Sequence, residues 1–166
     1  MRVFKETQRF NQWWLRLLVI AVMGVCIAAT VNAFDKITED PTQFWVILII
    51  STLTIVILIF LLVFTKLETK IDEKGIHYKF WPFNLSERLL SWREISSCEV
   101  RKYSPISEYG GWGYRTGFTK NSGALNVKGN KGIQIELKNG KKLLLGTQKG
   151  TDVNAVLKTY SGKLIS

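Results

Sequence analysis

Two long apolar runs without charge dominate the first part of the chain. The first extends from Leu17 to Phe34 and the second from Phe44 to Phe64, which is 18 and 21 residues counted inclusively. Neither run has polar residues at the 3.6-residue spacing of a helix that is half exposed to water. At about 1.5 Å of rise per residue, the second run spans roughly 32 Å, enough to cross a hydrocarbon core about 30 Å thick. The pattern predicts a transmembrane helical hairpin, with helices over about 13–34 and 44–64.

The charges that flank the two runs predict the orientation of this hairpin. Four Lys or Arg residues against one Glu precede the first run, the connection DKITEDPTQ is acidic, and four lysines follow the second run within residues 66–79. Because cationic flanks stay in the cytoplasm, both termini are expected on the cytoplasmic side. We therefore expect a multi-pass protein of the bacterial inner membrane.

A cleaved secretory signal is the alternative interpretation of the first run. Val31-Asn32-Ala33 resembles a small-residue cleavage site after a basic start. The run is nevertheless long for the apolar core of a signal, and a second spanning run follows within ten residues. We therefore expect the first helix to be retained.

After residue 66 the pattern changes to a period of two, which is typical of half-buried strands. Four segments alternate in this way, 67–71, 76–80, 98–103 and 133–137, and a returning strand is expected over 141–145. Asn139-Gly140 separates the last two segments and favours a tight hairpin, since both residues tolerate a positive φ. Thr151 offers an N-cap for a helix that ends near Tyr160.

These elements predict an α+β membrane protein with two domains. Residues 1–65 form the transmembrane hairpin, and residues 66–166 form a small cytoplasmic domain of antiparallel strands closed by a C-terminal helix. The second domain is of modal size and can bury one modest core.

This order of elements resembles the bacterial pleckstrin-homology-like family. The matching features are LETKIDEKGIHYKF, the connection SWREI, the hairpin GIQIELKNGKKLLLGTQ and the helix that begins at Thr151. The resemblance implies a small antiparallel β-barrel or sandwich with one closing helix, often preceded by membrane helices. The chain departs from a minimal member of the family through a Gly-rich insert between Ser104 and Gly132.

The positive charge of the second domain and the composition of the insert make the insert a candidate site for anions. Of the formal charge of +10, residues 66–166 carry +9, and a basic domain is attracted to the negative inner leaflet. The insert over 108–132 combines glycines, aromatic rings and cations, which suits an anion pocket or a loop in the headgroup layer. Its candidate residues for an anion or a lipid headgroup are Trp112, Arg115, Lys128 and Lys131. The alternative is a structural β-hairpin whose aromatic rings pack on the domain.

The first helix carries a stripe of small residues that favours close helix packing. The stripe consists of Ala21, Gly24, Ala28 and Asn32, at spacings of 3, 4 and 4. Its simplest use is packing within the hairpin, and its second use is a homo-oligomer.

Residues for catalysis are scarce. His77 is the single histidine, no recognisable nucleophile motif occurs, and Cys26 and Cys98 lie on segments that cannot easily meet. We expect no enzyme activity, no cofactor, no metal and no nucleic-acid partner. The pattern favours a membrane-anchored module that recruits or organises as yet unknown protein partners at the inner leaflet. The alternatives are a module that senses anionic lipid and an accessory subunit of a larger membrane complex.

Overall fold

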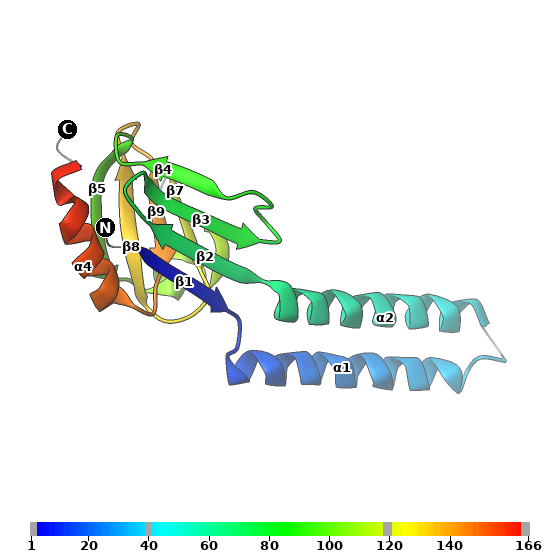
Figure 1. Ribbon diagram of the computed structural model, residues 1–166. Helices are drawn as coiled ribbons and strands as arrows, with labels where there is room; N and C mark the ends of the chain where they lie inside the picture. Colours follow the sequence, from blue (N-terminus) through cyan, green and yellow to red (C-terminus); the bar gives the residue numbers. More distant parts are fainter. Residues whose placement is uncertain (1–2, 39–40, 118–120, 164–166) are drawn as a thin grey trace. The chain divides into compact units, whose positions relative to one another are not determined.

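The computed structural model describes residues 3–38, 41–117 and 121–163 and is drawn in Figure 1. The chain divides into two compact units. Residues 10–65 form the helical unit, and residues 1–9 together with 66–166 form the β unit. The expected boundary after residue 65 agrees with this division. The expected assignment of residues 1–9 to the helical domain does not, because these residues belong to the β unit.

The helical unit is a hairpin of two long apolar helices. Helix α1 spans Trp13–Phe34 and α2 spans Pro41–Phe64. Both are long and apolar enough to cross a membrane, and only 11% of the apolar window of α1 and none of that of α2 is buried. Helix α2 begins earlier than expected because Pro41 suits the first turn of a helix, where no N–H is needed. The two-helix hairpin is thus confirmed.

The small-residue stripe of α1 does not pack within this hairpin. Ala21, Gly24, Ala28 and Asn32 are all exposed, and a Cβ added at Gly24 would meet no atom within 4 Å. The buried residues of α1 are Val19 and Ala33. At about 100° per residue, the stripe lies about 140–220° around the helix from Val19, so α1 turns its other side to α2. The expected use within the hairpin is wrong, and the use in a homo-oligomer stays a prediction.

The β unit contains two sheets whose strands cross in Figure 1. Sheet A has the order β1-β2-β3-β4 and is antiparallel throughout. Its strands are β1 Phe4–Arg9, β2 Lys66–Ile71, β3 Gly75–Trp81 and β4 Arg88–Ser91. Sheet B has the order β5-β8-β9-β7-β6. Its strands are β5 Ile95–Lys102, β6 Gly113–Thr116, β7 Ser122–Asn126, β8 Lys131–Leu137 and β9 Lys142–Gly146.

The architecture is α+β, as expected; of the two expected forms, barrel and sandwich, the closed barrel is wrong, and the strands are not all antiparallel as both forms required. The two sheets are not closed on each other, and β7 pairs with β9 in parallel. The parallel pair arises because β7 and its partner β6 come from the insert and add to the free edge of the β8–β9 hairpin. That hairpin is confirmed, with Gly140 at φ +80° in its turn. The insert itself forms an antiparallel pair, β6–β7, after the short helix α3, Pro105–Tyr109.

Helix α4, Gly150–Tyr160, packs on β5 and β8 and covers one end of the core (Figure 1); the 3₁₀ turn η1, Ser161–Lys163, follows it. It buries Val153, Val156, Leu157 and Tyr160, which recur at helical spacing. The Tyr160 ring stacks on Trp92 with 5.4 Å between centroids, and the Trp92 indole donates to the Asp72 carbonyl at 2.9 Å. The C-terminal helix is therefore confirmed, but the expected N-cap is wrong: the helix begins at Gly150, its N-cap is Lys149, and Thr151 lies in its first turn.

Strand β1 is one of the elements that sequence reasoning missed, together with β4 and α3. It pairs with β2 along its whole length, from Phe4 opposite Ile71 to Arg9 opposite Lys66. Its side chains alternate, so that Phe4, Glu6 and Gln8 are buried and the intervening residues are exposed. The segments before and after the apolar hairpin are thus joined in one sheet.

Polar contacts with sheet B hold β1 in place. The Glu6 carboxylate accepts hydrogen bonds from Thr147 Oγ1 at 2.6 Å and from the Gln148 N–H at 2.8 Å. The Gln8 side-chain amide donates to the Gly146 carbonyl at 2.7 Å. A buried carboxylate is costly unless donors satisfy it, and here two hydrogen bonds offset the cost of taking the Glu6 charge out of water. Glu6 therefore links β1 to the end of β9.

Replacement of Glu6 tests this link. We expect Glu6→Ala to lower the free energy of unfolding of the full chain in mild detergent by about 1–3 kcal/mol, because it leaves the Thr147 hydroxyl and the Gln148 N–H without an acceptor. The matched control is Glu73→Ala, which removes an exposed carboxylate from a turn of the same unit. Equal melting temperatures for the two variants would contradict the role given to Glu6.

Candidate functional site

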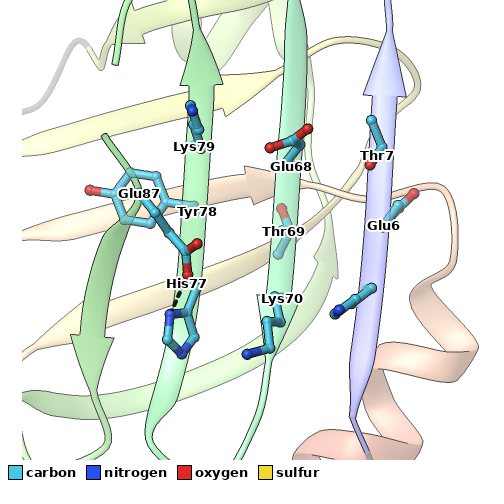
Figure 2. Close-up of a pocket in the computed structure, with 10 residues that line it drawn as sticks. Glu6, Thr7, Glu68, Thr69, Lys70, His77, Tyr78, Lys79 and Glu87 are labelled. Atoms are coloured by element: carbon cyan, nitrogen blue, oxygen red, sulfur yellow. Dashed lines mark ion pairs between the residues drawn. The ribbon is translucent and has the colours of Figure 1, made fainter. Parts of the chain in front are cut away.

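The outer face of sheet A is a shallow polar hollow of about 240 Å³. Figure 2 shows three of its side chains, Thr7, Glu68 and Lys79, side by side on β1, β2 and β3. Its charged groups mostly neutralise one another. Lys66 Nζ lies 2.7 Å from Glu68 Oε1, and Lys70 Nζ lies 2.7 Å from Asp72 Oδ2. Such a paired face is typical of a solvated sheet surface rather than of a site for a charged ligand.

His77 lies in this hollow between two carboxylates. Its Nε2 is 3.1 Å from Asp72 Oδ1, and its Nδ1 is 2.5 Å from Glu87 Oε1, the pair drawn as a dashed line in Figure 2. Each ring nitrogen thus has a carboxylate oxygen within hydrogen-bond distance, and the arrangement ties β3 to the loop before β4.

A second hollow lies between the two sheets, and we call it the intersheet cleft. It has a volume of about 270 Å³ and is bordered by β3 and β4 of sheet A and by β6, β7 and β9 of sheet B. Its apolar wall includes Leu90, Leu125 and Leu143. It forms because β4 is short and because the sheets are not closed at this side.

Cations border the same cleft. Arg88, Arg115 and Lys141 line it and are exposed. None of the three forms an ion pair with a carboxylate among the described residues; the Arg115 Nε–H donates only to the Trp112 carbonyl, at 3.1 Å. A fourth cation, Lys142, is paired with Glu136. The apolar wall beside these cations distinguishes this cleft from the hollow on sheet A, whose described lining is mostly polar.

Of the four insert residues predicted from the sequence, Trp112 is in direct contact with Arg115, whose Nε–H donates to the Trp112 carbonyl at 3.1 Å. Arg115 on β6 lies opposite Ala124 and lines the intersheet cleft. Lys128 lies beyond the end of β7, in the bend that leads to β8. The Trp112 indole bonds to the Gly129 carbonyl at 3.0 Å, near Lys128. Trp112 therefore lies between Arg115 and the Lys128-Gly129 bend, and of the predicted set Arg115 lines the cleft.

Lys131 lies at the end of sheet B that is remote from the cleft. It opens β8 opposite Lys102, and its carbonyl accepts from the Thr147 N–H at 2.9 Å. It therefore belongs with Lys128 rather than with Arg115.

The cleft residues on sheet A were missed by sequence reasoning. Arg88 and Leu90 alternate on β4, a strand too short to give a clear period-two signal. Lys141 follows the Asn139-Gly140 turn, some fifty residues away in sequence. Only the packing of one sheet on the other places these residues around one cleft.

The remaining reactive groups suit structural roles. Burial, with a smaller contribution from the Glu99 charge, raises the pKa of the Cys98 thiol to about 12, so the thiol stays protonated and is a poor nucleophile. Among the described residues no group of three His, Cys, Asp or Glu side chains could hold a metal ion.

Comparison with known proteins adds no assignment. A scan against protein-family models and a search of the curated proteins each found no match.

The Asp72 cluster gives a prediction about acid stability. Desolvation raises the pKa of Asp72, but hydrogen bonds from Lys70, the Lys74 backbone and His77 outweigh it, so the pKa lies well below its ordinary value of 3.8. A carboxyl with a depressed pKa stabilises the fold above its unfolded pKa and loses this contribution as the pH falls through its folded pKa. We expect Asp72→Asn to cost about 1 kcal/mol at pH 6–7 and progressively less below about pH 4.

Unfolding of the full chain in detergent from pH 7 to pH 3 measures this difference. Glu73→Gln is the control, since its side chain is exposed on the adjacent turn. A cost of Asp72→Asn that does not change with pH would contradict the assignment.

Proposed function

We propose that the chain is a non-enzymatic, membrane-anchored interaction module. Its apolar hairpin spans the bacterial inner membrane, and its β unit lies at the cytoplasmic leaflet, where it recruits or organises protein partners. The proposal includes a pleckstrin-homology-like identity for the β unit, supported by two packed sheets and one C-terminal helix on the core.

The observation that carries the proposal is the pairing of β1 with β2. Arg9 and Lys66 are register partners, and α1 begins at Trp13 while α2 ends at Phe64. Both helices therefore depart from one end of one sheet. A hairpin that crosses a membrane twice meets this requirement, because its two ends return to the same side. The same requirement would also be met if the two helices were buried in another protein, but that explanation needs an additional partner.

The exposed surface of the helices favours lipid as their surroundings. Most large apolar side chains of α1 and α2 are exposed; Ile20 is 62% and Val25 is 70% accessible. Soluble monomers rarely expose a contiguous apolar surface beyond a few hundred Å². Burial in hydrocarbon removes this cost, and the helical backbone satisfies its own hydrogen bonds there.

The alternative of anionic-lipid sensing is favoured by a specific observation, the unpaired cations at the intersheet cleft. Lipid sensing and membrane anchoring are compatible functions, because anchoring keeps the β unit near the lipid that it would bind.

Cysteine labelling in intact cells tests the anchoring. In a variant with Cys26 and Cys98 replaced by Ser, we expect an impermeant thiol reagent to label Thr38→Cys without permeabilisation. Lys5→Cys and Lys163→Cys should react only after permeabilisation, because both lie in the β unit, on the side of the cationic flanks.

Two results would overturn parts of this proposal. Labelling of Lys5→Cys and Lys163→Cys from opposite sides would contradict the joined hairpin. Labelling of both from outside, with Thr38→Cys protected, would reverse the orientation.

A further inference from the structure

Strand β6 is an open edge of sheet B. It is the last strand in the order of that sheet, and the described residues place no strand on its other side. The Gly117 N–H donates to the carbonyl of Ser122, directly opposite, at 2.8 Å, so these two residues are a hydrogen-bonded pair of the ladder with β7. Hydrogen-bonded and open positions alternate along an antiparallel strand. The N–H and C=O groups of Tyr114 and Thr116 therefore point away from β7, where a further strand would pair.

The intersheet cleft lies beside this edge and has an apolar wall. Tyr114 and Thr116 line it from β6, and Leu90 lines it from β4, the edge strand of the other sheet. Leu90 shares the inward face of sheet A with Ile76, its buried register partner. At about 270 Å³ the cleft is small for a drug-sized ligand. It suits a few side chains of a segment that pairs with β6.

Exposed apolar side chains continue this surface outside the cleft. Phe83, which is 56% exposed, lies 6.0 Å from Tyr114 between ring centroids, and Leu89 on β4 is also exposed. Large apolar side chains that are left exposed together mark surfaces on which a partner packs, and aromatic rings are enriched in protein interfaces. The surroundings of the β6 edge therefore fit a protein segment.

The charge of the cleft indicates what this segment carries. Arg88 shares the inward face of sheet A with its register partner Tyr78, and Lys141 follows the turn between β8 and β9. Both cations line the cleft and are exposed. In the part of the chain that the structure describes, neither forms an ion pair with a carboxylate. A carboxylate of the partner would supply the missing counter-charge, so the complementary segment is acidic.

The free backbone edge distinguishes a peptide from other anionic ligands. An inorganic anion would interact with the cations, and a lipid would interact with the cations and the apolar wall. Both would leave the regularly spaced N–H and C=O groups of β6 unpaired. A peptide strand uses all three features, because main-chain hydrogen bonds hold it while alternate side chains enter the cleft.

We infer that an extended acidic segment of a partner protein adds as a strand to the free edge of β6. Its backbone pairs with Tyr114 and Thr116. Apolar side chains at every second position enter the intersheet cleft and cover Leu90, and a carboxylate of the segment pairs with Arg88 or Lys141. This inference rests on the proposed interaction function and names the chemistry of the partner.

Selection from a random library of heptapeptides displayed on phage tests the inference. The target is the full chain in mild detergent, after removal of the peptides that bind empty micelles. We expect the enriched peptides to carry Asp or Glu and to have apolar residues at alternate positions. A synthetic peptide of the most enriched sequence then serves as the probe, and fluorescence anisotropy measures its dissociation constant.

The variant Thr116→Pro tests the backbone contact. It removes an outward N–H of β6 and leaves the ladder with β7 intact, since proline is tolerated on an edge strand where the N–H faces outward. We expect it to weaken binding about tenfold or more, because one inter-strand hydrogen bond is lost and the ring blocks the partner strand. The matched control, Thr116→Val, keeps the N–H and should bind like the wild type. Equal binding by the proline variant and the wild type would overturn the β6 edge as the site.

N-methylation of the peptide tests the same contact without a change in the chain, so it decides the question even if the proline variant does not fold. Methyl groups on alternate residues remove the N–H groups on one side of an extended peptide, and two complementary sets cover both sides. We expect one set to abolish binding and the other to keep it, because only one side of the peptide faces β6. Equal effects of the two sets would contradict strand addition.

Replacement of Arg88 and Lys141 together by Gln tests the charge of the partner. We expect a loss of affinity of about tenfold, because the peptide carboxylate then lacks its counter-charge. The matched control replaces Lys102 and Lys128, two exposed cations at the other end of sheet B, and should leave the affinity unchanged. An equal loss in both double variants, or a loss in the cleft variant without one in Thr116→Pro, would show a general charge effect and would overturn the inference.

The same selection separates this inference from the proposed function. Enriched peptides that bind the wild type and Thr116→Pro equally contradict the inference alone, because they use another surface of the chain. A selection that enriches no peptide contradicts the proposed interaction function as well. A dimer that forms without peptide and that Thr116→Pro abolishes would make a second copy the occupant of the edge, and it would overturn the assignment to a partner protein.

Discussion

The antiparallel pairing of β1 with β2 is the constraint on which the rest of the structure depends. It joins residues on both sides of a segment of 56 residues, from Phe10 to Thr65, into adjacent strands. Closing so long a loop carries an entropic cost that grows only slowly with its length. The ladder, the buried Phe4 and the two acceptor bonds of Glu6 offset that cost. The hairpin is thereby an insertion into a β unit rather than a leader attached to one.

This constraint also determines where the surfaces of the β unit lie. Because β1 completes one edge of sheet A, the opposite edge is the short strand β4. The insert strands β6 and β7 extend sheet B without pairing to β4, so the two sheets stay open between them. The intersheet cleft is a consequence of that opening. A closed barrel of the expected kind would fill the same space with side chains of both sheets.

The local patterns of the sequence predicted most of the elements. The two apolar runs, the alternation in β2, β3 and β8, and the Asn139-Gly140 turn each have a short-range physical cause, so the sequence shows them directly. The alternation of β1 was overlooked because its inward positions include Glu6 and Gln8, which are polar residues. Their burial depends on acceptors and donors near Thr147, which no local pattern indicates. The cleft likewise unites Arg88, Arg115 and Lys141 through packing alone.

Disulfide trapping between β1 and β2 tests the central claim most directly. Thr7 and Glu68 are register partners with outward side chains, close enough for a disulfide, whereas Lys79 lies one strand further, about 9–10 Å from Thr7. In a chain without native cysteines and with a protease site in the connection at 35–38, the double variant Thr7→Cys, Glu68→Cys should stay at full length after cleavage on a non-reducing gel. The pair Thr7→Cys, Lys79→Cys should separate. Separation of the first pair, or equal retention of both, would contradict the joined sheet.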